Sequence, residues 1–243
     1  MDKAAIILAA GKGKRMKSDL PKVLHKLNGK PIVDYVIDNV RSAGYNKVIL
    51  VIGHGRELVK KELSDRDLEF AIQAEQLGTG HAVKCAEPFL TEFDGTVLVL
   101  AGDMPLISPT TINKLTDTHA HSKAAATVLS VKLPDPTGYG RIVRNERGEF
   151  IRITEERDAT PDIKRINEVN TGIICFDAKP LFEAIALLRC DNEQGEYYLT
   201  DCIEIYVDKG VKVSAVVADD YREGMGINSI DQLKEVEAIL RED

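Results

Sequence analysis

Short apolar runs alternate with amphipathic stretches along the first half of the chain. The first run, Ala4 to Ala10, is nearly unbroken and ends in Gly11, which predicts a strand buried on both faces of a parallel sheet. Lys47 to Ile52 and Val97 to Ala101 repeat this pattern, and residues 31–43 between the first two runs have helical spacing. The alternation predicts a layered α/β fold with a mainly parallel sheet and helices on both faces.

The pattern changes beyond about residue 120. Ala124 to Val131 and Val169 to Phe176 are predicted strands, and the proline- and glycine-rich stretch between them indicates a turn-rich insertion. Within it, Ile142 to Ile153 has the pattern of a hairpin. Residues 180–188, 199–209 and a final stretch from about Ser229 have helical spacing. We therefore expect a single domain over residues 1–243 with an inserted β subregion.

Composition limits the classes of protein and partner. The chain has 243 residues, of which 44% are hydrophobic and 29% charged, which suits one large α/β domain. No apolar run approaches the ~20 residues that span a bilayer, and the N-terminus lacks a signal peptide, so we expect a cytoplasmic protein with no membrane partner. A net charge of −7 disfavours nucleic acid as a partner. The four scattered cysteines are expected to be reduced thiols.

A glycine-containing basic loop follows the first predicted strand. Gly11 and Gly13 allow backbone amides to approach a ligand closely and to form a cradle for phosphate. In an acidic protein, a local cluster of positive charge indicates a polyanionic ligand. The cluster between residues 12 and 22 consists of Lys12, Lys14, Arg15, Lys17 and Lys22, with Asp19 as its one acid. A solvated basic turn without a ligand is the alternative interpretation of this loop alone.

Two familiar phosphate-binding motifs do not fit this loop. A dinucleotide fingerprint needs a third small residue where Met16 stands. A P-loop needs GxxxxGK followed by Ser or Thr, and the sequence contains no such string. Neither hydride transfer nor P-loop phosphoryl transfer is therefore indicated. The five histidines share no catalytic spacing, and we expect them to be structural or exposed.

An aspartate follows the third predicted strand. In open α/β sheets, ligands bind at the carboxyl ends of the strands, and Asp103 lies at such an end. Mg²⁺ takes one or two hard oxygen ligands from a protein and the rest from phosphate and water. Asp103 is therefore a candidate metal ligand, with a turn aspartate that caps the next segment as the alternative.

The segment LAAGKGKRMKSDLPKVLH, from Leu8, closely resembles the signature loop of bacterial UDP-N-acetylglucosamine pyrophosphorylases, which belong to the sugar nucleotidyltransferase superfamily. The resemblance continues in the same order over essentially the whole chain. Its other segments are QAEQLGTGHAV from Gln73, LAGDMPLI from Leu100, TGYGRIVR from Thr137, INEVNTGI from Ile166 and QGEYYLTD from Gln194. GxGxR alone is shared with cytidylyl- and guanylyltransferases, whereas QLGTGHA together with QGEYYLTD is much narrower.

The resemblance implies a Rossmann-like nucleotidyltransferase fold and a magnesium-dependent sugar-1-phosphate uridylyltransferase. Such an enzyme joins UTP to a sugar 1-phosphate, here N-acetylglucosamine 1-phosphate, and releases pyrophosphate. Residues 1–120 would then form the nucleotide-binding half and residues 121–243 mainly the sugar-binding half. The sequence leaves assembly into a homo-oligomer open. Many members of the resembled family continue into a β-helix with acetyltransferase activity, but hexapeptide repeats are absent here, and we expect no such activity.

The resemblance also implies the site residues. The catalytic residues would be Arg15, Lys22 and Asp103, with Asp103 and Asn228 as the metal ligands. The nucleotide-binding residues would be Leu8, Ala9, Ala10, Gly11, Lys22, Gln73, Gly78 and Thr79. The sugar-binding residues would be Gly140, Glu155, Asn170 and Asn228.

Several alternatives stay open at this point. Asn228 could instead be the N-cap of the last helix, Glu155 a solvated charge, and Gln73 a surface residue at a strand end. Tyr197 and Tyr198 are expected either at the wall of the sugar pocket or in the core. A related transferase for another base or sugar, and a non-catalytic nucleotide-binding regulator, are the competing functions.

Overall fold

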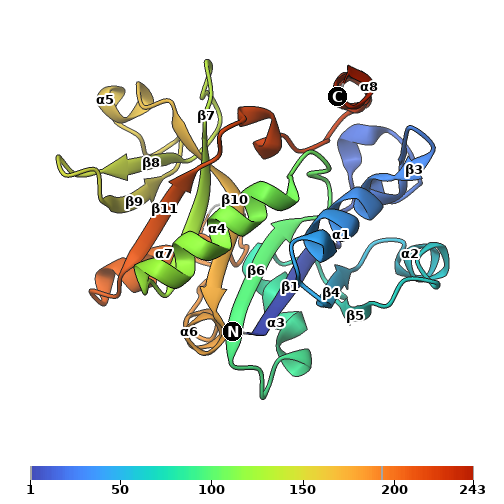
Figure 1. Ribbon diagram of the computed structural model, residues 1–243, viewed down its shortest axis with the longest axis horizontal. Helices are drawn as coiled ribbons and strands as arrows, with labels where there is room; N and C mark the ends of the chain where they lie inside the picture. The colour runs from blue at the N-terminus through green and yellow to red at the C-terminus, as the bar shows by residue number, and fades with distance from the viewer. Residues whose placement is uncertain (1, 193, 243) are drawn as a thin grey trace.

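The computed structural model describes residues 2–192 and 194–242. Within these residues, nine strands form one central sheet in the order β11-β7-β10-β6-β1-β4-β5, with β8 paired to β10 and β9 to β8 (Figure 1). In the first half the strands are β1 (Asp2–Ala9), β4 (Lys47–Ile52), β5 (Glu69–Ile72) and β6 (Gly95–Ala101). In the second half they are β7 (Ala126–Lys132), β8 (Arg141–Arg144), β9 (Phe150–Thr154), β10 (Glu168–Asp177) and β11 (Val213–Val217). A separate two-stranded ribbon consists of β2 (Lys26–Leu27) and β3 (Lys30–Pro31).

Helices and short 3₁₀ turns connect these strands. The α-helices are α1 (Ile32–Ser42), α2 (Arg56–Glu62), α3 (Thr79–Ala86), α4 (Pro109–Ser122), α5 (Pro161–Lys164), α6 (Ala178–Ile185), α7 (Asp201–Asp208) and α8 (Ile230–Glu242). The 3₁₀ turns are η1 (Lys14–Met16), η2 (Lys22–Leu24), η3 (Glu87–Phe89) and η4 (Tyr221–Gly224). None of the helices among the described residues is long and apolar enough to cross a membrane.

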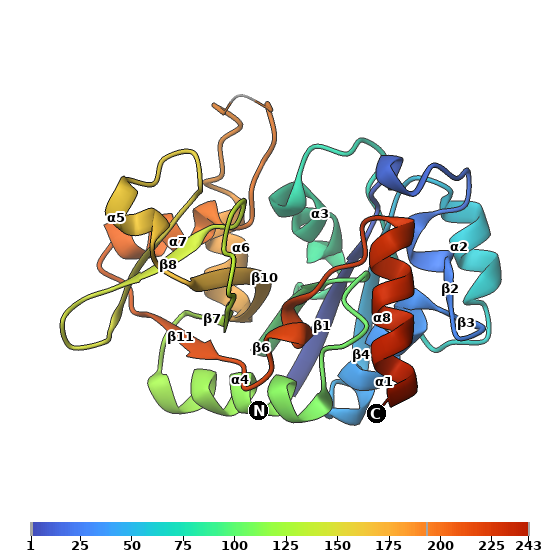
Figure 2. The ribbon, with the colours of Figure 1, turned by 90° about the horizontal axis from the view of Figure 1, so that it is seen from above.

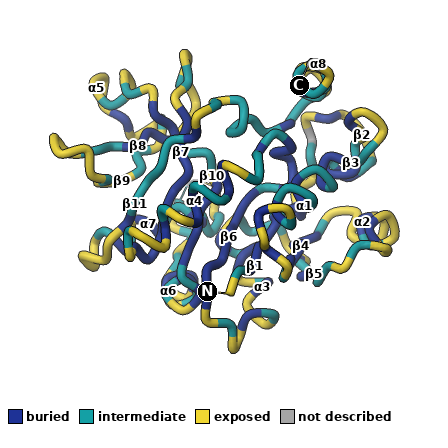
Figure 3. The backbone as a smooth tube through the Cα atoms, in the orientation of Figure 1, coloured by how far each residue is buried: buried dark blue, intermediate teal, exposed yellow. Residues whose placement is uncertain are grey.

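The apolar strands are covered on both faces, as their sequence predicts. Successive side chains of a strand point to opposite faces of a sheet. On β1, Ala5 and Ile7 pack with α1 and α4, whereas Ala4 and Ile6 pack with α3, α6 and α7. Figure 2 shows these two groups of helices on opposite sides of the sheet, and Figure 3 shows the buried strands between exposed outer turns. The prediction of a layered fold is confirmed.

The sheet is mainly parallel. Strands β5, β4, β1 and β6 run in one direction, and β7 and β11 run parallel to each other. β10 runs in the opposite direction, because it pairs antiparallel with both β6 and β7, and β9 at the end of the sheet also runs against the majority. The predicted hairpin is present as β8 and β9, and it extends the sheet through the pairing of β8 with β10.

The last helix closes the carboxyl edge of the parallel strands. β1 starts in the lower part of Figure 1 and runs upward, and β4 and β6 run parallel to it. The carboxyl ends of these three strands therefore lie toward the upper part of the picture, where α8 is found. Ile227 and Val236, before and within α8, pack with Met16 of η1 and with Leu27 and Ile32. This small apolar cluster brings the C-terminal segment to the basic loop.

Candidate active site

Three polar side chains from distant segments meet at the carboxyl edge of the sheet. Asp103 lies two residues after β6, Lys22 opens η2, and Asn228 precedes α8. The Nζ atom of Lys22 forms an ion pair with Asp103 Oδ2 and donates a hydrogen bond of 3.0 Å to Asn228 Oδ1. These contacts join residues that are 81 and 206 positions apart in the chain. The basic loop and the carboxylate after β6 therefore belong to one site.

The local backbone fixes this cluster. Ile227 N donates to Asp103 O at 2.9 Å, which holds the 226–228 segment beside the end of β6. Ser229 is the residue that caps α8, since Gln232 N donates to its Oγ at 3.2 Å. Gln232 Oε1 in turn accepts from Asn228 N at 2.8 Å, so the Asn228 side chain is not the helix cap. The Ser-x-x-Gln spacing is the sequence signal that identifies the cap.

The cluster suits a hard divalent cation. The side chains of Lys22 and Asp103 are only 17% and 11% exposed. Little water therefore screens the attraction between opposite charges at this site. Two oxygens, one from the Asp103 carboxylate and one from the Asn228 amide, converge on the Lys22 ammonium. The ammonium lies where a metal cation would contact both oxygens. The described residues contain no group of three or more His, Cys, Asp or Glu that could hold a metal. A metal at Asp103 and Asn228 would therefore complete its shell with substrate oxygens and water.

The backbone at the start of the basic loop packs closely against Lys22. Gly13 has a φ of +57°, and a Cβ atom there would lie 2.8 Å from Lys22 Cβ, so only glycine fits without a shift. Arg15 is exposed, and no hydrogen bond or ion pair within residues 2–192 and 194–242 involves it. Its role as a catalytic residue stays a prediction. The Lys14 side chain lies outside what the structure describes.

The residues predicted to bind the base lie where β1, β4 and β5 end. Gln73 follows β5 and is only 3% exposed, so the interpretation as a surface residue is wrong. A Cβ atom on Gly53, after β4, would lie 2.8 Å from Gln73 O and 3.0 Å from Ala10 Cβ. The carbonyl of Leu8 accepts from Gly102 N at 2.9 Å, which links the same edge to Asp103. Leu8, Ala10, Gln73 and Asp103 therefore share one edge of the sheet, and Ala9 and Gly11 flank Ala10 there.

A pair of loops, residues 77–80 and 197–199, forms what we call the GTG latch. Tyr197 N donates to Leu77 O at 2.8 Å, and Gly80 N donates to Tyr197 O at 2.8 Å. Leu199 N donates to Thr79 Oγ1 at 2.9 Å. Gly78 has a φ of +103°, and a Cβ atom there would lie 2.5 Å from Tyr197 O. The two narrow sequence motifs are thus one structural unit, in which Tyr197 acts through its backbone.

Three of the four residues predicted to bind the sugar also converge, whereas the fourth, Asn228, lies with Lys22 and Asp103. Asn170 N donates to Gly140 O at 2.9 Å, and a Cβ atom on Gly140 would lie 3.1 Å from Glu155 Oε1. Asn170 Oδ1 accepts from Gly172 N at 2.9 Å, which orients the side-chain amide. The register of β10 shifts between Asn170 and Ile174, and such irregularities often redirect side chains next to binding sites.

Two adjacent glutamates have different surroundings. Desolvation by neighbouring atoms and the charge of Asp158 raise the pKa of Glu155, although the residue as a whole stays exposed. Glu156 instead forms an ion pair of 2.7 Å with Arg141, whose side chain is only 2% exposed. Glu156 therefore has a structural partner, and Glu155 is the carboxyl group that lies against Gly140.

Residues 5–169 of the chain match the MobA-like NTP transferase domain. The chain belongs to this family. The match covers most of β1, the basic loop, Asp103 and Glu155, but it ends before Asn170, Tyr197 and Asn228. The nucleotidyltransferase fold implied by the sequence is confirmed by this match together with the layered, mainly parallel sheet.

Similarity to individual relatives extends over nearly the whole chain. The "Bifunctional protein GlmU" of Clostridium botulinum (strain Loch Maree / Type A3) is 52% identical over 241 residues, which is 99% of this chain and 52% of that protein. The protein of the same name from Shouchella clausii (strain KSM-K16) is 52% identical over 237 residues, with 98% and 52% covered. That from Clostridium beijerinckii is 50% identical over 241 residues, with 99% and 52% covered. The chain spans about half the length of the curated relatives it matches.

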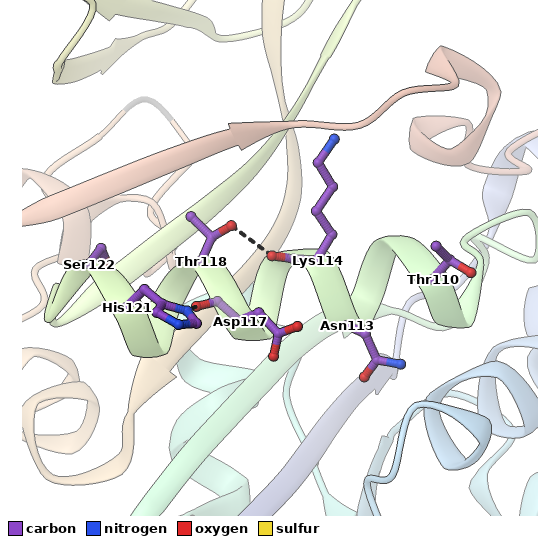
Figure 4. A pocket seen from close by; sticks show the side chains of 7 residues that line it. All are labelled: Thr110, Asn113, Lys114, Asp117, Thr118, His121 and Ser122. Atoms are coloured by element: carbon purple, nitrogen blue, oxygen red, sulfur yellow. Dashed lines mark hydrogen bonds between the residues drawn. The ribbon is translucent and has the colours of Figure 1, made fainter.

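Two hollows lie on the surface of this transferase domain. One, of about 800 Å³, is lined by Glu155, Asp158, Tyr198 and Asp201 together with residues of β9 and α7. Tyr198 thus lines the same hollow as Glu155, one of the residues predicted to bind the sugar. The other, of about 900 Å³, is a broad depression along α4 (Figure 4). It contains none of the predicted site residues, and side chains within it bond to their own helix, as Thr118 Oγ1 does to Lys114 O at 2.7 Å. We assign no ligand to it.

One residue that the sequence analysis set aside contacts the predicted base site. His81, in the first turn of α3, has its Nδ1 atom 3.2 Å from Gln73 Nε2. Spacing between histidines gave no indication of this contact. Its position within GTGHA, next to the latch glycines, is the only sequence signal for it.

Proposed function

We propose that this chain transfers a uridylyl group from UTP to a sugar 1-phosphate, with N-acetylglucosamine 1-phosphate as the acceptor. The observation that carries the proposal is the contact of Lys22 with both Asp103 and Asn228, which unites the phosphate-binding loop with the carboxylate at the strand ends. Membership of the NTP transferase family and identity of about half to relatives named GlmU support it. The choice of uracil and of N-acetylglucosamine comes from the sequence resemblance.

The reaction is an in-line displacement at the α-phosphorus of UTP. A phosphate oxygen of the sugar 1-phosphate forms the new P–O bond, and the bond from the α-phosphorus to the bridging oxygen breaks, so pyrophosphate leaves with the electron pair. The attacking oxygen is already an anion near neutral pH, and no general base is required. Rate enhancement then depends on positioning and charge neutralisation.

The chain's own residues supply those two effects. Asp103 and Asn228 would hold Mg²⁺, which supplies Lewis-acid neutralisation of phosphate charge when bound. Lys22, which contacts both oxygens, would hold the α-phosphate region with its ammonium group once these oxygens served a metal. Arg15, exposed on the adjacent loop, would contact the departing pyrophosphate with its planar guanidinium.

The two halves of the chain divide the substrates in this proposal. Residues 1–120 contribute the basic loop, Gln73 and the Gly78–Thr79 segment to the nucleotide. Residues 121–243 contribute Gly140, Glu155 and Asn170 to sugar hydroxyls, because carboxylate and amide groups can fix several of them at once.

The test is pyrophosphate release with UTP, N-acetylglucosamine 1-phosphate and Mg²⁺, each omitted in turn. We expect release only when all three are present, and the fastest release with UTP among the four common nucleoside triphosphates. Faster release with another triphosphate or sugar phosphate would replace the substrate assignment. Binding of UTP without turnover on any sugar phosphate would show a nucleotide-binding regulator instead.

A further inference from the structure

The side-chain amide of Gln73 is held by two acceptors. Its Nε2 atom lies 3.0 Å from Gly78 O and 3.2 Å from His81 Nδ1. A carboxamide nitrogen carries two hydrogens, and these two contacts use both of them. The opposite orientation of the amide would place Oε1 against the Gly78 carbonyl, acceptor against acceptor. The contact with Gly78 O therefore favours one orientation, and a second acceptor at His81 reinforces it.

The ring of His81 is itself held in place. Because Gln73 Nε2 is a donor only, His81 Nδ1 accepts, and the proton of the neutral ring lies on Nε2. That nitrogen is 4.0 Å from Cys85 Sγ, one helical turn further along α3. On another side, the centroid of the His81 ring lies 6.5 Å from that of Tyr197, whose backbone forms the GTG latch. The latch thus connects to Gln73 through one imidazole.

This arrangement leaves one atom of the Gln73 amide for a ligand. Among the residues that the structure describes, no hydrogen bond uses Gln73 Oε1. The oxygen of a carboxamide can only accept a hydrogen bond. The N3 position of uracil carries a hydrogen and donates, whereas N3 of cytosine has a lone pair and accepts. A fixed Oε1 therefore pairs with N3–H of uracil and opposes N3 of cytosine.

We propose that His81 is a positioning residue for base selection: its Nδ1 atom holds the Gln73 amide with Oε1 toward the base, so that uracil is selected over cytosine. The inference rests on the proposed function, because it takes Gln73 as the residue that meets the base. Without the His81 acceptor, the Gly78 carbonyl is the one remaining partner among the described residues that opposes rotation of the amide by half a turn, and the rotated amide presents Nε2, which pairs with N3 of cytosine. Loss of the acceptor should thus relax selection rather than abolish turnover.

Three variants at one position separate the acceptor from the ring. In His81→Phe a planar ring remains and the acceptor is lost. In His81→Asn, Oδ1 stands close to the place of Nδ1 and restores an acceptor. In His81→Gln the acceptor sits one bond further out, away from the place of Nδ1. Cys85→Ala is the matched control, because it changes the neighbour of His81 Nε2 and leaves the Nδ1 contact intact.

The measured quantity is the ratio of kcat/KM for UTP to kcat/KM for CTP, with thermal unfolding as a check on folding. We expect His81→Phe and His81→Gln to lower this ratio by roughly 10- to 100-fold, the size that an unpaired polar group in a binding site commonly gives. His81→Asn and Cys85→Ala should keep the ratio within about threefold of the parent, a difference near the low end of what one hydrogen bond contributes. If His81→Phe does not fold, the contrast between His81→Gln and His81→Asn carries the same test.

An unchanged ratio in His81→Phe and His81→Gln would overturn the inference. An equal loss of kcat/KM for both nucleotides would also overturn it, since that outcome indicates only a structural role. Failure of the proposed function looks different, because the parent enzyme would then release no pyrophosphate from UTP. In that case, calorimetric binding of UTP and CTP to the same variants still tests the orientation of the amide.

Discussion

At one end of the candidate site, Lys22, Asp103 and Asn228 come from three distant segments and are joined through charge. At the other end, the backbone of Asn170 pairs with that of Gly140, and Glu155 approaches the same glycine. The first end contains a partly desolvated ion pair and suits polyphosphate and metal. The second contains the amide of Asn170, the carboxyl group of Glu155 and the backbone of Gly140 next to them, and such groups suit the neutral hydroxyls of a sugar. We therefore expect single substitutions at the charged end to cost far more activity.

The largest effect should come from Asp103→Asn. The variant keeps the shape of the side chain and removes its charge, so turnover should fall by about two to three orders of magnitude, as with other single electrostatic contacts to a transition state. Pyrophosphate release measures the rate, and the melting temperature shows whether the fold survives. Near-normal turnover in a folded Asp103→Asn protein would remove the metal assignment and with it the contrast between the two ends.

The second prediction concerns the sheet that supports the sugar end. Glu168 on β10 accepts from Arg144 Nε at 2.9 Å, from Arg144 Nη2 at 2.6 Å and from Ser130 Oγ at 2.6 Å. Burial alone would raise the pKa of Glu168, but the hydrogen bonds from Arg144 and Ser130 outweigh it and lower the pKa below its ordinary value. Glu168→Gln should therefore lower the free energy of unfolding by about 1–3 kcal/mol at neutral pH.

A denaturant titration measures this loss of unfolding free energy, and repeating it at several pH values tests the direction of the pKa shift of Glu168. The contribution of Glu168 is present above the ordinary carboxyl pKa and is lost as the pH falls through the lower pKa of the folded state. Asp162→Asn is the matched control, because its 3.2 Å ion pair with Arg165 is exposed and should contribute almost nothing. Equal losses in the two variants would show that burial does not matter here.

A third substitution, Glu155→Gln, tests the sugar end directly. Loss of a charged hydrogen-bond acceptor should raise KM for the sugar phosphate about tenfold and leave KM for UTP unchanged. Initial-rate measurements with each substrate varied in turn separate the two constants. Glu156→Gln should act in the opposite way, on stability and not on KM, because Glu156 pairs with the buried Arg141. A shift in the KM of UTP alone would place Glu155 at the wrong end of the site.

The smallest effect is the pH dependence of stability in Glu155→Gln. The pKa of Glu155 is raised in the folded state, so ionisation costs stability as the pH rises from the ordinary carboxyl value through the raised one. Glutamine removes that cost, and the variant should melt slightly higher at neutral pH and equally at pH values below both pKa values. Solvent reaches this residue, which keeps the difference small. A variant that melts lower at every pH would contradict the raised pKa.

The sequence by itself determined the layers and the chemistry of the loops. Lys47 to Ile52 is apolar throughout, and a strand of that kind must be covered on both faces, as β4 is. The short β5, Glu69–Ile72, and the small, weakly patterned β11 were not predicted, because four or five residues carry too little periodicity. The basic loop between residues 12 and 22 is visible as charge alone. The cap of the last helix was not predicted: Asn228 was the residue considered, whereas Ser229 is the cap, and the Ser229-x-x-Gln232 spacing is the signal that was overlooked.

Only the tertiary structure decided which polar groups meet. Nothing local in the chain specifies that Lys22 contacts Asn228, because the two residues are brought together by the packing of α8 on Met16, Leu27 and Ile32. The same holds for the GTG latch, whose halves are some 120 residues apart. The orientation of Gln73 depends on an acceptor that α3 supplies. Periodicity is a local property of a sequence, whereas partnership between side chains depends on how whole elements pack.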